Sequence, residues 1–178
     1  MVTFRIYVEG GGDSHDQETL FRRGWSKFFE NAGLRGRMPA IVRGGGRQST
    51  FDDFCVAIEN PKPSVVSLLL VDAEAPVAAG LNVWQHLATR DAWVKPQNAA
   101  DDSAFMMVQM MEHWFLADPN ALEKYFGQGF KKSAIRRWPA LEAVTRETVM
   151  NALAQATQNC TAPSITPKAN VLLKFWRW

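Results

Sequence analysis

The chain has 178 residues, of which 47% are hydrophobic and 21% charged, and its formal net charge is +2. This composition favours one globular domain and excludes a disordered chain, and no stretch approaches the roughly 18 consecutive apolar residues that a membrane span requires. The start MVTFRIYVEGGG lacks the order of a signal peptide, and Cys55 and Cys160 form no disulfide framework or zinc pattern, so we expect a cytoplasmic protein without membrane attachment.

The first residues predict a strand, a tight turn and a helix. Phe4–Val8 is rich in residues that favour strands and is followed closely by the glycines at 10–12, which is typical of a strand that ends in a turn. Ser14 and Gln17 have the spacing of a capping box for the helix that follows. We expect this helix to end near Gly33.

A second strand and helix follow. Ala40–Val42 predicts a short strand, and a second glycine run occupies 44–46. We expect Ser49 or Thr50 to cap the next helix, because apolar residues then recur at helical spacing from Phe51 onward.

The rest of the chain predicts two more strands and four helices. Val65–Val71 is a nearly unbroken apolar run, as a central parallel strand requires, and each large side chain buried there contributes about 1.5 to 3 kcal/mol. Phe105–Val108 predicts the fourth strand. The expected helices are Leu81–Ala88, Met111–Ala117, 119–126 with Asp118 as its cap, and 140–156.

The alternation of strands and helices predicts an α/β fold with a central, mostly parallel sheet flanked by helices and a helical C-terminal part. We expect one domain over residues 1–160 and an irregular tail over 161–178. Ligands in such folds bind beyond the carboxyl ends of the strands.

Carboxylates follow two of the predicted strands. Glu9 and Asp72 each come directly after an apolar run, so a parallel sheet brings both to one edge. Glu74 lies two residues after Asp72, and we expect an extended segment there, in which residues i and i+2 point the same way. Two carboxylates about 4 Å apart repel by roughly 4 kcal/mol at an effective dielectric near 20, a cost that a bound cation removes. Oxygen ligands of this kind favour Mg²⁺ or Mn²⁺. Either acid taken singly also fits a helix cap or a solvated side chain.

Four motifs occur in order: VEGGGDS at 8–14, GGR at 45–47, VDAEAPV at 71–77 and MEHWFLAD at 111–118. Together they resemble an uncharacterised bacterial family of the Toprim-like superfamily, over the chain up to about residue 160. The resemblance implies that Glu9 is a general acid or base, that Asp72 and Glu74 hold Mg²⁺, and that Glu112 is a further ligand. Glu112 equally fits an acid that pairs with a nearby base, and the adjacent His113 fits a structural side chain.

The second glycine run lies between two arginines. Glycine-rich backbone, including the amides of Gly10 and Gly11 in the first glycine run, and the guanidinium groups of Arg43 and Arg47 fit a phosphate-binding site. A turn with solvated arginines fits the same residues. Neither a GxxxxGK[ST] nor a GxGxxG motif is present.

Charge is unevenly distributed along the chain. Residues 61–120 carry three basic and seven acidic side chains, and residues 121–178 carry nine basic and three acidic ones. Nucleic acid needs cations along its path, so this division suits metal-assisted chemistry on phosphates, and solvated helix faces produce the same pattern. The basic residues that fit a nucleic-acid track are Lys131, Lys132, Arg136 and Arg137, with Trp138 as a base-stacking candidate.

These features predict a magnesium-dependent nuclease in bacterial defence or DNA repair. The alternative is a non-catalytic module that binds nucleic acid or regulates a partner ATPase. The ending TAPSITPKANVLLKFWRW departs from the family's pattern, so we expect a truncated or shifted reading frame there.

Overall fold

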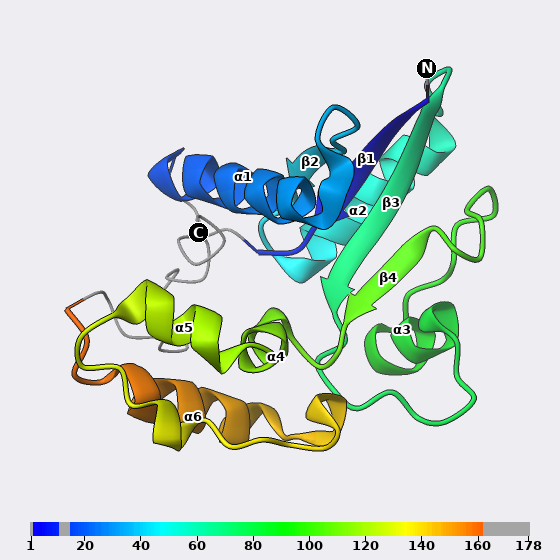
Figure 1. Cartoon of the computed structure of the whole chain (residues 1–178). Coiled ribbons are helices and arrows are strands. Elements are labelled where there is room, and N and C mark those ends of the chain that lie inside the picture. Colours follow the sequence, from blue (N-terminus) through cyan, green and yellow to red (C-terminus); the bar gives the residue numbers. More distant parts are fainter. Residues whose placement is uncertain (1, 11–14, 162–178) are drawn as a thin grey trace.

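A computed structural model describes residues 2–10 and 15–161 of the chain (Figure 1). Its centre is a four-stranded sheet in the order β2-β1-β3-β4, made of β1 (Thr3–Val8), β2 (Ala40–Arg43), β3 (Val65–Asp72) and β4 (Ala104–Met107). Every strand pairing is parallel, so all four carboxyl ends lie at one edge of the sheet. The α/β architecture predicted from sequence is confirmed, and it is consistent with a Toprim-like layered fold.

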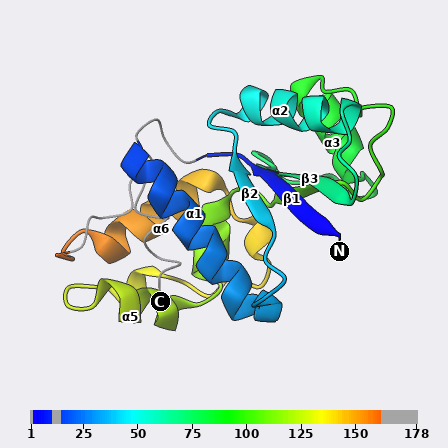
Figure 2. The same cartoon turned by 90° about the horizontal axis from the view of Figure 1, so that it is seen from above.

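Helices cover both faces of the sheet (Figure 2). The first and the last three lie on one face, and the second and third lie on the other. Their bounds are α1 (His15–Phe29), α2 (Arg47–Glu59), α3 (Val83–Asp91), α4 (Met111–Leu116), α5 (Pro119–Phe126) and α6 (Arg146–Thr157). A π-helical turn, Glu30–Leu34, extends α1, and Gly33 within it has a φ of +84°.

Two apolar cores lie on the two faces, because successive strand residues point to opposite sides. Val8 of β1 belongs to the core that Trp25 of α1 shares with α4, α5 and α6. Tyr7, its neighbour in sequence, belongs to the core under α2 and α3, where its ring meets that of Phe54 edge to face at 6.2 Å. Burial on both faces explains the apolar second half of β3, where Leu69–Val71 are buried, whereas Val66 in its first half is exposed.

The predicted cap of α2 is wrong. This helix begins at Arg47, with Gly46 at the N-cap position and no side-chain cap. Ser49 and Thr50 lie in its first turn, and their hydroxyls donate to the Gly46 carbonyl at 2.9 and 2.8 Å. Serine and threonine inside a helix bond backward to a carbonyl in this way, instead of capping.

Two other helices begin later than predicted, because a polar residue caps each of them. Asn82 forms a capping box with Gln85 and α3 begins at Val83. Thr145 accepts a hydrogen bond from the N–H of Thr148 at 3.3 Å, and α6 begins only at Arg146. The helix predicted over 140–156 is therefore wrong over 140–145, where Leu141–Ala143 form a 3₁₀ turn.

Of the two remaining cap predictions, one is confirmed and the other lies outside the described residues. Asp118 caps α5 as predicted, since its Oδ1 accepts from the N–H groups of Asn120 and Ala121 at 3.0 Å each. The capping box predicted for Ser14 and Gln17 lies outside the residues whose side chains the structure describes.

Candidate metal centre

Three carboxylates from two neighbouring strands meet at the carboxyl edge of the sheet. Glu9 follows β1 and Asp72 ends β3, and the N–H of Glu9 donates to the Leu70 carbonyl at 3.1 Å, which carries the strand pairing past the end of β1. Glu74 joins them, so that one oxygen from each of the three carboxylates lies within 4.8 Å of the others. The structure therefore brings together the three acids that the sequence singles out.

Glu74 reaches this cluster by a turn, not by the extended segment that the sequence predicts. Its φ is +62°, in the left-handed region, so the rule that residues i and i+2 of a strand point the same way does not apply. The N–H groups of Ala73 and Glu74 donate to the carbonyls of Met107 and Gln109 at 2.9 and 2.7 Å. These bonds anchor the turn to the segment after β4.

The Arg47 side chain is held at the site by several hydrogen bonds and ion pairs. Its Nη1 donates to Oε2 of Glu9 at 2.9 Å and to the Asp72 carbonyl at 2.6 Å. Its Nε and Nη2 form a bidentate pair with Asp91 of α3 at 2.9 and 2.7 Å, and its guanidinium carbon lies 4.9 Å from the centroid of the Trp93 ring. Arg47 was expected at a phosphate-binding site, and the structure places it against protein oxygens, where it orients Glu9.

Close packing at Gly44 sets the position of Arg47. A Cβ atom on Gly44 would overlap both the side chain and the backbone of Thr50 in the first turn of α2. Only glycine therefore allows the helix to begin so near the end of β2. Because Arg47 is the first residue of that helix, the same packing brings its side chain to Glu9.

The two glycine runs touch each other. Gly10 has a φ of +105°, and its N–H donates to the Gly45 carbonyl at 2.9 Å. Gly11 lies outside the described residues. Arg43 ends β2, where its Cα is paired with that of Val8. The phosphate-binding site predicted at these residues stays a prediction.

Three charged residues of the site are not predicted from the sequence. Besides Asp91, these are Arg90 and Arg146, which both pair with Oε2 of Glu74, Arg90 at 3.7 Å. Arg146 comes from the first turn of α6, far along the chain from Glu74. The excess of basic residues in the last third is the only sequence signal for Arg146, and it does not single this residue out.

The pKa of Asp72 reflects its burial next to other negative charges. This pKa is raised to about 7, first by burial and then by the negative charges of Glu9 and Glu112. The N–H of Met111, which donates to Asp72 Oδ1 at 3.0 Å, and the charge of Arg146 act in the opposite direction. A proton at Asp72 thus relieves repulsion near neutral pH, and a cation at this place would relieve it too.

Glu112 lies near the cluster but is not one of the three converging acids. Burial raises the pKa of its carboxyl, and no ion pair to it occurs in the part of the chain that the structure describes. The alternative that Glu112 pairs with a base therefore finds no support there. His113 beside it is buried, with Nε2 2.8 Å from the Val144 carbonyl, as a structural side chain would be.

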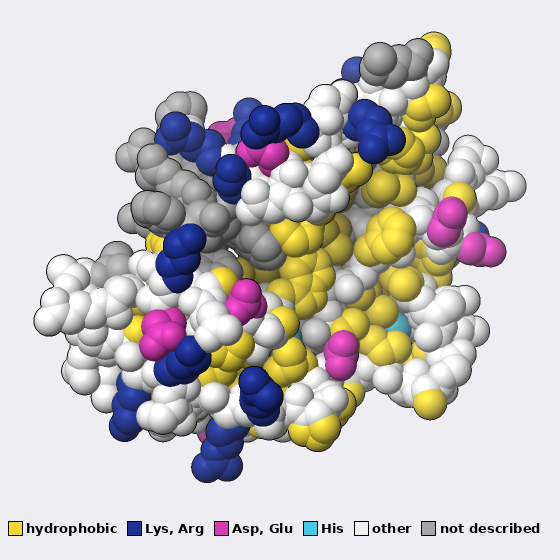
Figure 3. Space-filling model, in the orientation of Figure 1, with side chains coloured by type: hydrophobic (Ala, Val, Ile, Leu, Met, Phe, Trp, Pro, Cys, Tyr) yellow, Lys and Arg dark blue, Asp and Glu magenta, His cyan; other side chains and the backbone are white. Residues whose placement is uncertain are grey.

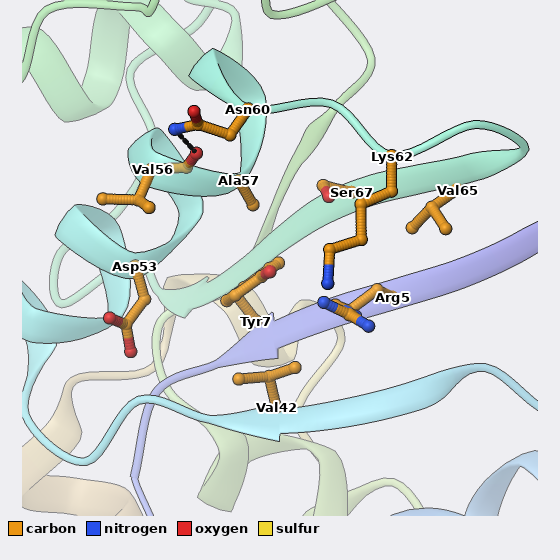
Figure 4. A pocket seen from close by; sticks show the side chains of 10 residues that line it. All are labelled: Arg5, Tyr7, Val42, Asp53, Val56, Ala57, Asn60, Lys62, Val65 and Ser67. Carbon is orange, nitrogen blue, oxygen red and sulfur yellow. Dashed lines mark hydrogen bonds between the residues drawn. The ribbon is translucent and has the colours of Figure 1, made fainter.

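A pocket lies away from the carboxylate cluster. This open pocket of about 380 Å³ lies between α2 and the sheet, and the residues that line it include Arg5, Tyr7 and Lys62 (Figure 4). None of the three converging carboxylates lines it. The carboxylate cluster is therefore the candidate site on the evidence of its own geometry.

Only some residues of the basic loop after α5 are placed as a nucleic-acid track would require. Lys132 pairs with Glu123 at 2.7 Å, and Trp138 packs against the core on the α1 side. Lys131, Arg136 and Arg137 are exposed. A nucleic-acid track along this loop stays a prediction, and Trp138 is better explained by packing.

Comparisons with known proteins give one match. No curated protein and no solved structure matches the chain. Within residues 2–10 and 15–161, none of the helices has the length and apolarity that crossing a bilayer requires. A comparison with protein families matches residues 8–165 to the family described as Domain of unknown function (DUF4276). The matched range includes Glu9, Asp72, Glu74 and Glu112. The chain belongs to this DUF4276 family.

Proposed function

We propose that this chain is a cytoplasmic, Toprim-like hydrolase that uses Mg²⁺ or Mn²⁺ to cleave phosphodiester bonds in nucleic acid, in bacterial defence or DNA repair. The observation that carries the proposal is the convergence of Glu9, Asp72 and Glu74 within 4.8 Å at the carboxyl edge of a parallel sheet. Ligands of α/β proteins bind at this edge.

The donor set fits a hard divalent cation. Carboxylate oxygens are the ligands that Mg²⁺ and Mn²⁺ prefer, and no thiolate or imidazole belongs to the group of three. The raised pKa of Asp72 reflects burial first and then the negative charges of Glu9 and Glu112, which the nearby Arg146 does not fully offset. Glu112 is close enough to affect that pKa, and we assign it a role outside the first ligand set, such as holding a metal-bound water.

A bound divalent cation would lower the pKa of a water molecule and offset charge on the phosphoryl oxygens. Glu9 is the group that takes the proton. Its Oε2 is held by Arg47 at 2.9 Å and by the Asp72 N–H at 3.2 Å, which fixes the carboxylate beside the other two acids, where it can accept a proton from water at the metal site. Asp72 accepts from Met111 through Oδ1, and its other oxygen remains for the metal.

Arg90 and Arg146 are the cations best placed to bind the substrate's phosphate. Both pair with Glu74, and the Arg146 side chain is 45% exposed. A metal ion bound to Glu74 would compete with these pairs and would free the Arg146 guanidinium for the substrate, while Arg90 keeps its second ion pair, to Asp91. Arginine forks match phosphate oxygens in geometry and charge.

Cleavage assays test the proposal. Plasmid and single-stranded DNA and RNA are incubated with the protein in Mg²⁺, in Mn²⁺ or in chelator, beside Glu9→Gln and Asp72→Asn. Asp53→Asn is the matched control, because Asp53 is an exposed acid on α2 outside the cluster. We expect cleavage that needs the metal, survives Asp53→Asn and is lost in the two cluster variants. Equal cleavage by all four proteins would overturn the assignment.

A further inference from the structure

One half of the sheet's α1 side lies open. The strand register makes Phe4 a neighbour of Val66 and Ile6 a neighbour of Leu68 on this face, and Phe105 continues the same face on β4. Three of these side chains remain well exposed, Phe4 at 46%, Val66 at 38% and Phe105 at 47%. We call these five residues, Phe4, Ile6, Val66, Leu68 and Phe105, the sheet patch.

The sheet patch is hollowed into one continuous groove. A hollow of about 530 Å³ is lined by Phe4, Ile6 and Leu68 with residues of the segment after α1, and a second of about 320 Å³ is lined by Ile6, Leu68 and Phe105 with Trp114. Ile6 and Leu68 line both hollows. Figure 3 shows hydrophobic side chains gathered here, between α1 and the β4 edge. Contiguous apolar surface of this kind marks an interaction site more often than a solvated face.

The two sides of the sheet patch carry opposite charge. On the α1 side, residues 18–39 hold five basic and two acidic side chains, a net charge of +3, and Arg37 of this segment lines the groove itself. On the β4 side, residues 95–103 hold Lys95, Asp101 and Asp102, a net charge of −1, and both aspartates are exposed. Figure 3 shows basic side chains over α1 and acidic ones beyond β4.

This arrangement is complementary to itself. A two-fold axis that lies in the plane of the sheet patch and runs along the strands turns a second copy face to face with the first. The same rotation exchanges the two sides, so each copy's basic side meets the other copy's acidic side. We propose that the sheet patch is the interface of a two-fold symmetric dimer of this chain. No patch residue belongs to the carboxylate cluster, so the dimer does not depend on the proposed function.

Sedimentation equilibrium of the full chain over a wide concentration range tests the apolar part of the interface. We expect the wild type to associate to a dimer. Phe105→Glu places a charge within the apolar sheet patch and should weaken dimerisation at least about tenfold. Val94→Glu is the matched control, because Val94 is 81% exposed and lies outside the patch. A wild type that stays monomeric throughout, or a Phe105→Glu variant that dimerises normally, would overturn the proposal.

Charge reversal tests the two-fold arrangement. Arg37→Glu and Asp102→Lys each place like charges opposite one another at both ends of the interface, and each should weaken self-association. An equal mixture of the two variants restores one attractive pair at each end, and we expect the mixture to form heterodimers more tightly than either variant forms homodimers. A mixture that associates no better than the separate variants would rule out the proposed geometry.

Discussion

Replacing Asp72 by asparagine should stabilise the metal-free protein at high pH. The pKa of Asp72 rises from 3.8 to about 7 on folding, so the folded state holds this proton more tightly than the unfolded state. Stability is therefore lost as pH rises from about 4 to about 7. A shift of three units corresponds to about 4 kcal/mol. At 4.8 Å, the upper limit of the separation between the carboxylate oxygens, Coulomb repulsion gives a similar figure, about 3.5 kcal/mol at an effective dielectric of 20.

The asparagine variant keeps an Oδ1 acceptor for the Met111 N–H but carries no charge. Weakening of that bond reduces the gain, so we expect Asp72→Asn to be more stable than wild type by about 2 to 3 kcal/mol at pH 8. This corresponds to roughly 5 to 10 °C in Tm for a chain of this size. Near pH 4 the two proteins should differ little.

Urea unfolding followed by tryptophan fluorescence, in chelator at pH 4.5 and about pH 8, measures this difference. Asp53→Asn is the control for loss of an exposed acid. Asp72→Asn that is less stable than wild type at both pH values, or a difference that does not change with pH, would refute the electrostatic reasoning.

Three further predictions concern the arginines and the glycine turn. Arg47→Lys should lower the free energy of unfolding by about 2 to 4 kcal/mol, since lysine cannot pair bidentately with Asp91 while also reaching Glu9; urea unfolding equal to wild type would contradict this. Gly44→Ala should lower the free energy of unfolding by about 2 kcal/mol or more, because the added Cβ overlaps Thr50. Gly46→Ala should lower it by less than about 1 kcal/mol, because its Cβ meets only Ser49 at 3.8 Å. Thermal unfolding of both variants measures this difference. Arg146→Ala should bind Mn²⁺ more tightly and nucleic acid more weakly than wild type, because a competitor for Glu74 and a phosphate contact are lost together; a fall in both affinities would point to a structural role instead.

Sequence patterns were sufficient for the strands and for part of the site. Each predicted strand is found with its ends displaced by one residue at most, because apolar runs such as Val65–Val71 favour a strand in a parallel sheet, where Leu69–Val71 are buried on both faces. The meeting of Glu9 and Asp72 follows from this topology, since residues after neighbouring parallel strands share one edge.

The rest of the site depends on tertiary contacts that leave no local pattern. Arg146 reaches Glu74 only because α6 packs against α4, and its own neighbours in sequence give no sign of this. Asp91 holds Arg47 from the end of α3, and close packing at Gly44 decides where α2 begins. Glu74 itself lies at a left-handed turn, which an extended reading of VDAE could not anticipate.

Metal titration tests the central claim, that Glu9, Asp72 and Glu74 form a divalent cation site, most directly. Isothermal titration calorimetry with Mg²⁺ and Mn²⁺ near neutral pH should reveal saturable binding to the wild type and to Asp53→Asn. Binding should be lost or greatly weakened in Glu9→Gln and Asp72→Asn, with circular dichroism to verify that both variants are folded. Absence of binding to the wild type, or unchanged affinity in Asp72→Asn, would contradict the metal centre.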